Sequence, residues 1–100
     1  MANVIEEIAA ERKRQIEIEG WTAGHDDEHS SGEMARASAV YVLHGVENLH
    51  GAFTILRWGN VLYHLWPWSR EWWKPSTNRR NLIKAAALIV AEIERIDRAS

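Results

Sequence analysis

The chain has 100 residues, no cysteine and a net charge of −2, with 46% hydrophobic and 26% charged residues. This length and composition predict one globular domain spanning residues 1–100, and the missing cysteines exclude disulfides and thiolate metal sites. No apolar run reaches the ~20 residues that cross a bilayer, and the acidic N-terminus differs from a secretory signal. We therefore expect a cytoplasmic protein with no membrane partner.

A first helix is predicted from Asn3 to Glu19. Asn3 is a good N-cap, and acidic residues in the following turn suit the positive pole of the helix. Gly20 suits the left-handed conformation that ends many helices. One face repeats at three- and four-residue steps and is expected to face the core; it carries Ile5, Ile8, Ala9, Arg12 and Ile16.

Residues 22–30 are strongly polar and are predicted to form a loop. A capping box at Ser30–Glu33 predicts the start of a second helix, which Gly45 is expected to end. Because the loop precedes this helix, the four-residue spacing of His25 and His29 is not expected on one helical face. We therefore expect these polar residues to be solvated or capping, and we predict no metal site.

The middle of the chain is rich in β-branched and aromatic residues. The segments Phe53–Trp58 and Val61–Trp66 are separated by Gly59-Asn60, which favours a two-residue hairpin turn. Apolar and polar residues do not alternate cleanly there, so a helix is the alternative.

A last helix is predicted to begin after Ser76 or Thr77 and to end near Arg98. Its alanines invite close packing of another helix. The positions expected to face the core are Leu82, Ile83, Ala86, Ile89, Val90, Ile93 and Ile96. The predicted fold is mainly α, a compact three-helix domain with a candidate central β-hairpin (α+β).

The segment from Leu65 to Arg80 concentrates four of the six tryptophans and four cations. Tryptophan supplies a flat apolar face, and arginine and lysine bind anions, so this segment is typical of a site for a flat, negatively charged ligand. Core packing is the alternative for the tryptophans. Two adjacent tryptophans, Trp72 and Trp73, cannot easily both point inward, so we expect at least one to be exposed.

The cations Lys74, Arg79 and Arg80 stand at the start of the last helix, where the helix dipole disfavours positive charge. A bound anion would compensate for this penalty. Alternatively, the arginines pair with the acidic first helix, and the two arrangements can coexist. Residues 1–50 carry ten acidic and four basic side chains, whereas residues 51–100 carry four acidic and eight basic ones, which also favours association of copies.

Duplex DNA is not an expected partner, because a pI near 6.2 leaves no broad basic surface for the phosphates. A metal-dependent nucleotide hydrolase would need helical carboxylate pairs that face each other. The candidate set matches this requirement poorly; it comprises Glu7, Glu11, Glu33, His25 and Asp26.

Several short motifs cover both ends of the chain but not Val46–Leu65. They are Ala10-Glu11-Arg12, Gln15, Glu19-Gly20-Trp21-Thr22, His25-Asp26-Asp27, His29, Gly32-Glu33, Tyr41, Trp66-Pro67-Trp68, Trp72-Trp73-Lys74-Pro75, Arg79-Arg80, Leu82 and Lys84–Arg95. Together these motifs resemble a family of small phage and prophage proteins. The first helix, Gly20-Trp21-Thr22 and Asp26-Asp27 also resemble, more loosely, ryanodine-receptor-type repeat domains.

The resemblance to phage proteins implies a small counter-defence protein in the host cytoplasm, and prokaryotic repeat domains of the second kind are thought to sense nucleotide-derived ligands. We therefore expect a non-catalytic, cofactor-free homo-oligomer that sequesters a cyclic nucleotide or an ADP-ribose-like signal. A protein-interaction module that inhibits a host protein is the alternative, followed by the hydrolase. The expected ligand-binding residues are Arg12, Gln15, Trp21, Asp26, Asp27, Arg70, Trp72, Trp73, Lys74, Arg79 and Arg80.

Overall fold

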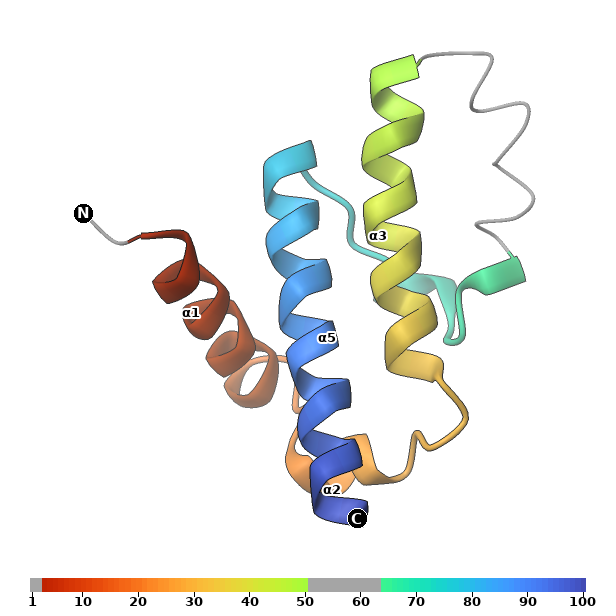
Figure 1. The fold of residues 1–100 in the computed structure, drawn as a ribbon. Coiled ribbons are helices and arrows are strands. Elements are labelled where there is room, and N and C mark those ends of the chain that lie inside the picture. Colours follow the sequence, from red (N-terminus) through yellow and green to blue (C-terminus); the bar gives the residue numbers. More distant parts are fainter. Residues whose placement is uncertain (1–2, 51–63) are drawn as a thin grey trace.

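The computed structural model describes residues 3–50 and 64–100, except for the side chains of residues 45–50 and 70. The long C-terminal helix lies between the first and third helices and also contacts the second (Figure 1). The elements in chain order are α1 (Val4–Glu17), α2 (Ala23–Asp27), α3 (Glu33–His50), the 3₁₀ turn η1 (Arg70–Trp72) and α5 (Asn78–Ala99).

The described residues are mainly helical and contain no strand, which confirms the mainly α class. Most of the predicted hairpin, at residues 53–66, falls on residues 51–63 and so lies outside the described residues. At its end, His64 and Leu65 are helical rather than extended. None of the helices in the described part of the chain is long and apolar enough to span a membrane.

The first and last helices begin where their capping residues predict. The Asn3 side chain accepts a hydrogen bond from the Glu6 N–H at 2.9 Å, and Thr77 accepts one from the Arg80 N–H at 3.1 Å. Helix α1 ends at Glu17, two residues earlier than predicted, and Gly20 then takes the expected positive φ of 78°.

The loop predicted at residues 22–30 is wrong for residues 23–27, because Thr22 caps a short helix there, whereas residues 28–30 are not helical. The Thr22 hydroxyl accepts a hydrogen bond from the His25 N–H at 3.3 Å, and α2 follows directly. The strongly polar composition gave no apolar periodicity from which this helical turn could be predicted, since its stability depends on a cap and not on an apolar face. Only Asp26 of α2 is buried.

Helix α3 differs from its prediction at both ends. It begins at Glu33 after Gly32, whose φ is 82°, and the Glu33 carboxylate accepts a hydrogen bond from the Ser31 N–H at 2.7 Å rather than from Ser30. It continues through Gly45 to His50. A glycine inside a helix costs only about 1 kcal/mol, which the surrounding residues of a long helix can offset.

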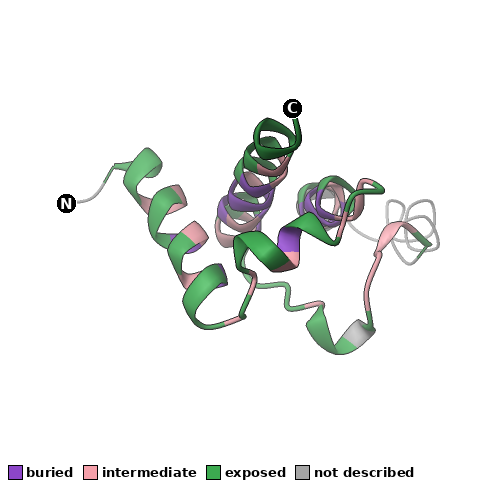
Figure 2. Cartoon of the chain, turned by 90° about the horizontal axis from the view of Figure 1, so that it is seen from below, coloured by how far each residue is buried: buried purple, intermediate pink, exposed green. Residues whose placement is uncertain are grey.

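The core lies where α3 and α5 pack against each other, and half of its buried residues are alanines (Figure 2). Alanine faces allow the two helix backbones to approach closely, as the sequence predicts. Four tryptophans pack against this cluster: Trp21, Trp66, Trp68 and Trp73. The fully buried members are Met34, Ala37, Tyr41, Ala85, Leu88 and Ala91.

The predicted core faces of α1 and α5 are largely wrong. On α1 the buried residues are Glu11 and Gln15, whereas Ile5 and Ile16 are exposed. On α5 only Ile83 of the predicted large residues is buried. Helix α5 turns mainly its alanines to its neighbours, together with Ile83 and Leu88. The large apolar side chains that remain exposed are Leu82, Ile89, Val90, Ile93 and Ile96.

The segment that leads into α5 is tied to the helices by its backbone. The Lys74 N–H donates to the Tyr41 hydroxyl at 3.4 Å, and the Lys74 carbonyl accepts from Lys84 Nζ at 2.6 Å. The Asn81 side chain, which is buried, accepts from the Ser76 N–H and donates to the Ser76 carbonyl. These bonds fix the tryptophan-rich segment against the bundle.

Two apolar residues test this core assignment, because Leu88 of α5 is 1% exposed and Ile5 of α1 is 69% exposed. We expect Leu88→Ala to lower the free energy of unfolding by about 3 kcal/mol, through lost burial and the cavity left behind. The matched change Ile5→Ala should cost less than about 1 kcal/mol. Urea denaturation followed by circular dichroism measures both; equal losses would contradict the assignment.

Candidate functional site

Glu11 lies in the contact between α1 and α5 and is 1% exposed. Its carboxylate accepts hydrogen bonds from Arg14 at 2.8 Å, from Gln15 at 3.1 Å and from Arg80 of α5. Burial would raise the pKa of Glu11, but the hydrogen bonds and charges of Arg14 and Arg80 more than offset it, so the pKa is lowered. Glu11 is therefore an ionised, buried link between the two helices.

Glu19 forms a second ion-paired group just beyond the end of α1. Arg14 donates to it at 3.0 Å, and Lys74 donates at 3.1 Å from the tryptophan-rich segment. Burial opposes ionisation of Glu19, but the hydrogen bonds from the two cations lower its pKa. Lys74 is thus held at the surface by a carboxylate of the first half of the chain.

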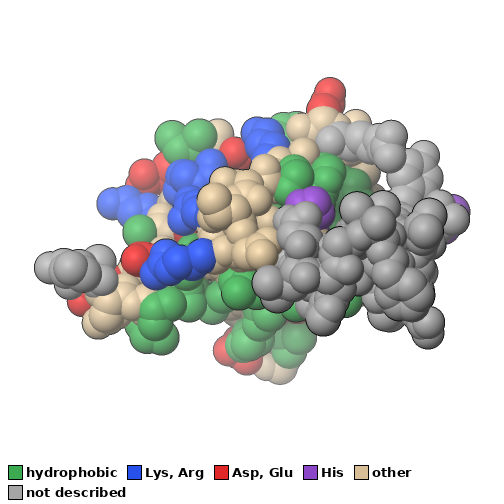
Figure 3. Space-filling view, turned by 90° about the horizontal axis from the view of Figure 1, so that it is seen from above, with side chains coloured by type: hydrophobic (Ala, Val, Ile, Leu, Met, Phe, Trp, Pro, Cys, Tyr) green, Lys and Arg blue, Asp and Glu red, His purple; other side chains and the backbone are tan. Residues whose placement is uncertain are grey.

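The cations at the start of α5 pair with α1, as one of the two predicted arrangements requires. Besides the Arg80–Glu11 pair, Arg79 contacts Glu7 at 2.7 Å, and the Arg79 hydrogen bond lowers the pKa of Glu7. Cationic and acidic side chains accordingly lie next to one another on the face shown in Figure 3. These carboxylates offset the unfavourable helix dipole. An anion at this helix end stays a prediction.

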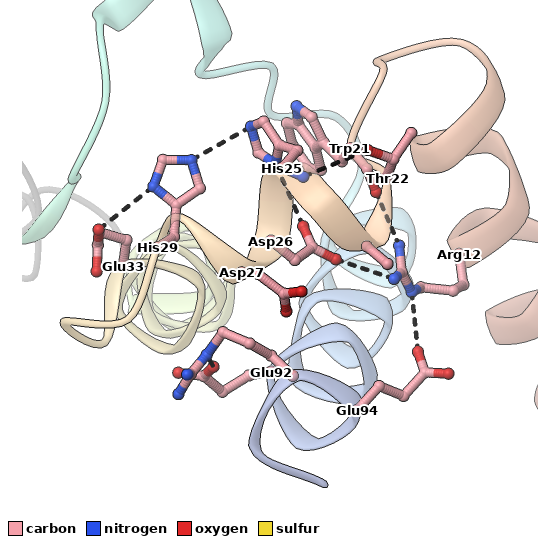
Figure 4. A network of polar contacts seen from close by, with 12 residues as sticks. Arg12, Trp21, Thr22, His25, Asp26, Asp27, His29, Glu33, Glu92 and Glu94 are labelled. Carbon is pink, nitrogen blue, oxygen red and sulfur yellow. Dashed lines mark hydrogen bonds and ion pairs between the residues drawn. The ribbon is translucent and has the colours of Figure 1, made fainter. Parts of the chain in front are cut away.

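Two aspartates of α2 fasten it to the longer helices (Figure 4). Asp26 is buried and accepts from Arg12 at 3.0 Å, while Arg12 also donates to Glu94 of α5 at 3.2 Å. Asp27 accepts from Arg98 at 2.8 Å. Arg12, Asp26 and Asp27 therefore have structural partners already.

A cavity of about 330 Å³ opens between the end of α1, α2 and the tryptophan-rich segment. Trp21 and Trp68 have ring centroids 5.5 Å apart, and Trp68 meets the edge of His29 at 5.5 Å. Trp72, which is 39% exposed, completes the aromatic wall. The full lining is Glu19, Trp21, His25, His29, Trp68, Ser69 and Trp72.

The predicted site residues divide between this cavity and the ion-pair network. Trp21 and Trp72 line the cavity, and Lys74 lies beside it, with Nζ 5.6 Å from the centre of the Trp72 ring. Trp73 packs instead against Tyr41 and Trp66. The side chain of Arg70 lies outside the described residues. The remaining predicted residues belong to the ion-pair network or border it; they are Arg12, Gln15, Asp26, Asp27, Arg79 and Arg80.

Sequence reasoning missed five residues of the cavity wall: Glu19, His25, His29, Trp68 and Ser69. The four-residue spacing of the histidines was the available signal, because a helical turn brings residues four apart to one side. His29 lies just beyond α2, where its N–H still donates to the Asp26 carbonyl at 3.0 Å. Interpreting residues 22–30 as a loop removed that signal.

The carboxylates proposed for a hydrolase do not gather at one point. Glu7 and Glu11 contact arginines of α5, whereas Glu33 contacts His29. Within residues 3–50 and 64–100, no three histidine, aspartate or glutamate side chains are grouped as metal ligands. This arrangement gives no support to the hydrolase alternative.

Comparison of the chain with protein-family models, with curated protein sequences and with solved structures finds no match. The geometry of the cavity and of the ion pairs around it is therefore the basis for proposing a function.

The lowered pKa values of Glu11 and Glu19 predict that the stability of the fold depends on pH. Because the pKa values of Glu11 and Glu19 are lowered by folding, their contribution is complete above the ordinary glutamate pKa of about 4.3 and is lost as pH falls through the folded values. At pH 7 we expect Glu11→Gln to lower the free energy of unfolding by about 3 kcal/mol.

The partners of Glu11 are partly exposed and can be rehydrated, so we do not expect a larger loss. The control Glu7→Gln removes an exposed pair and should leave stability almost unchanged, because solvent screens such pairs. Urea denaturation from pH 3 to pH 7 measures both variants. An acid-induced loss as steep in Glu11→Gln as in the wild type would contradict this role.

Proposed function

We propose that this protein binds a flat, nucleotide-derived ligand without transforming it, with the base held in the aromatic cavity. The observation that carries this proposal is the cavity of about 330 Å³ with three indole rings in its wall. Stacking of a base on an aromatic side chain contributes about 1–3 kcal/mol and tolerates any base, since every base has a π-face.

The size of the cavity favours a base or nucleoside inside and the phosphates outside. Small-molecule pockets usually enclose about 300–1,000 Å³, so this one is near the lower limit. Lys74 beside Trp72 is the cation nearest to such a phosphate, which would compete with Glu19 for its ammonium group.

This proposal changes the expected role of the aspartates. Both oxygens of Asp26 are in contact with side chains of the protein, one with Arg12 and the other with His25, so Asp26 is better suited to shaping the cavity than to accepting a ribose proton. Sequestration of a host signal by a phage-type protein follows from the resemblance of the sequence motifs and is part of the same proposal.

A protein-interaction role is supported by a different observation, the exposed apolar face of α5. The apolar residues on this face recur at alternating steps of three and four residues, which is the spacing of a face that packs against another helix. We call this row of residues the seam. We infer that a second copy of the chain covers this face, which gives the homo-oligomer that the charge distribution of the sequence favours. The seam comprises Leu82, Ala86, Ile89, Ile93 and Ile96.

Trp72 provides the sharpest test of ligand binding, because it lines the cavity and is exposed enough to be removed without loss of the fold. A panel of cyclic nucleotides and ADP-ribose derivatives should raise the melting temperature of the wild type. Trp72→Ala should weaken binding of the best ligand at least about tenfold in calorimetry, since one stacking contact is lost.

The matched control is Arg79→Ala, which removes an exposed cation outside the cavity and should leave this affinity unchanged. No ligand-dependent stabilisation across the panel, or equal weakening by both variants, would contradict the proposal.

Self-association is tested at Ile93, which lies in the seam and is 52% exposed. We expect Ile93→Lys to leave the helical content unchanged and to shift the protein to monomer in light scattering, because charge in an apolar interface is costly. The control Ile5→Lys changes an exposed isoleucine of α1 and should keep the wild-type mass. A monomeric wild type would exclude the second copy.

A further inference from the structure

Two histidine side chains face each other at one wall of the cavity. His25 Nε2 and His29 Nε2 are 3.3 Å apart, and the rings meet edge to face. Figure 4 shows the two rings turned toward one another, with a carboxylate on the far side of each. The fold thus produces a line of four side chains, Asp26, His25, His29 and Glu33.

The outer contacts orient each Nδ1 as a donor, so that a neutral ring leaves its Nε2 unprotonated. His25 Nδ1 is 3.2 Å from Asp26 Oδ1, and His29 Nδ1 is 3.3 Å from Glu33 Oε2. Carboxylate oxygens accept hydrogen bonds, so each Nδ1 is the donor and each Nε2 presents a lone pair. The other oxygens of the two carboxylates are also acceptors, one from Arg12 and one from the Ser31 N–H.

Two lone pairs that face each other at 3.3 Å repel, and a cation that both nitrogens share removes the repulsion, whether it is a proton or a metal ion. Two imidazole nitrogens that bind one tetrahedral Zn²⁺ at about 2.0–2.1 Å are themselves about 3.3–3.4 Å apart. The observed separation matches this distance. Carboxylates that accept the second N–H of each ligating histidine are also the usual outer partners of such a metal ion.

We propose that His25 and His29 bind a divalent transition metal ion of the zinc type through their Nε2 atoms. No third histidine, aspartate or glutamate of the described residues groups with them, so the other coordination positions are open to water or to a ligand in the cavity. The site goes beyond nucleotide binding and can exist without it.

The local structure holds both rings for this role. Thr22 caps α2, and beyond its last residue, Asp27, the chain continues to turn, because the His29 N–H donates to the Asp26 carbonyl at 3.0 Å. This turn brings the ring of His29 next to that of His25. Trp21 stacks on His25 with an interplanar angle of 10°, and Trp68 packs against His29. Packing on two sides limits the rotamers of the imidazoles, which favours a preformed site over an incidental approach.

The test uses Zn²⁺ alone with the full chain, in the absence of nucleotide. Calorimetry should find a single Zn²⁺ ion per chain, and EDTA should reverse the accompanying rise in melting temperature. His29→Gln should weaken binding at least about tenfold, since loss of even an outer partner of a ligating histidine costs about 10–100-fold.

The matched control is His64→Gln, because His64 is exposed and lies outside this pair. It should bind Zn²⁺ as the wild type does. Equal weakening by both changes would indicate nonspecific binding and would overturn the proposal, as would a wild type that does not bind Zn²⁺.

A measurement on the unmodified protein covers the case in which His29→Gln does not fold. On titration with Zn²⁺, the imidazole NMR signals of His25 and His29 should shift together and saturate at one equivalent. Shifts confined to other histidines would place the ion elsewhere and would overturn the proposal.

Discussion

The carboxylate of Glu11 lies at the contact of α1 with α5, where water is excluded, and three side chains from two helices hydrogen-bond to it. Removing an ion from water is costly, and only near-complete pairing repays that cost. This requirement fixes the position of Arg80 and therefore of the first turn of α5 relative to α1. Glu19 extends the same constraint to Lys74.

The position of the tryptophan-rich segment follows from these contacts. Lys74 is bound through its side chain to Glu19 and through its backbone to Tyr41 and Lys84, so the end of the tryptophan-rich segment is fixed against the helices. The indole ring of Trp68 then meets Trp21 and His29, and these three rings form the cavity wall together with His25 and Trp72. The ion pairs around Glu11 and Glu19 thus position the aromatic cavity, although Glu19 alone of these two carboxylates lines it.

The cavity combines two chemistries that are useful together. Indole rings bind flat ligands with little selectivity, whereas a pair of imidazoles held by carboxylates places directed lone pairs at a defined point. A metal ion with open positions at that point would add a charge able to attract a phosphate or a ring nitrogen. The proposed base-binding and metal-binding roles are compatible for this reason, although each stands on its own contacts.

The sequence by itself determined the elements whose signals are local. Asn3 and Thr77 cap the first and last helices, alanines line the contact of α3 with α5, and the arginines of α5 pair with acidic α1 as one predicted arrangement requires. A helix cap acts within about three residues, so it can be predicted without coordinates. Opposite charge on two helices can likewise be counted in the sequence, and it favours their pairing.

Only the tertiary structure decided which faces are buried and where the cavity forms. Periodicity marks an apolar stripe on α5, but the side that is buried depends on where α1 and α3 approach, and the alanine side allows the closer contact. The helical turn of α2 likewise depends on a cap and on ion pairs to distant helices. Burial depends on neighbours that are far apart in the chain. The cavity wall is an example, because Trp68 and Trp72 complete it from a distant segment. The contact of His25 with His29 likewise depends on the fold, which holds the turn between them.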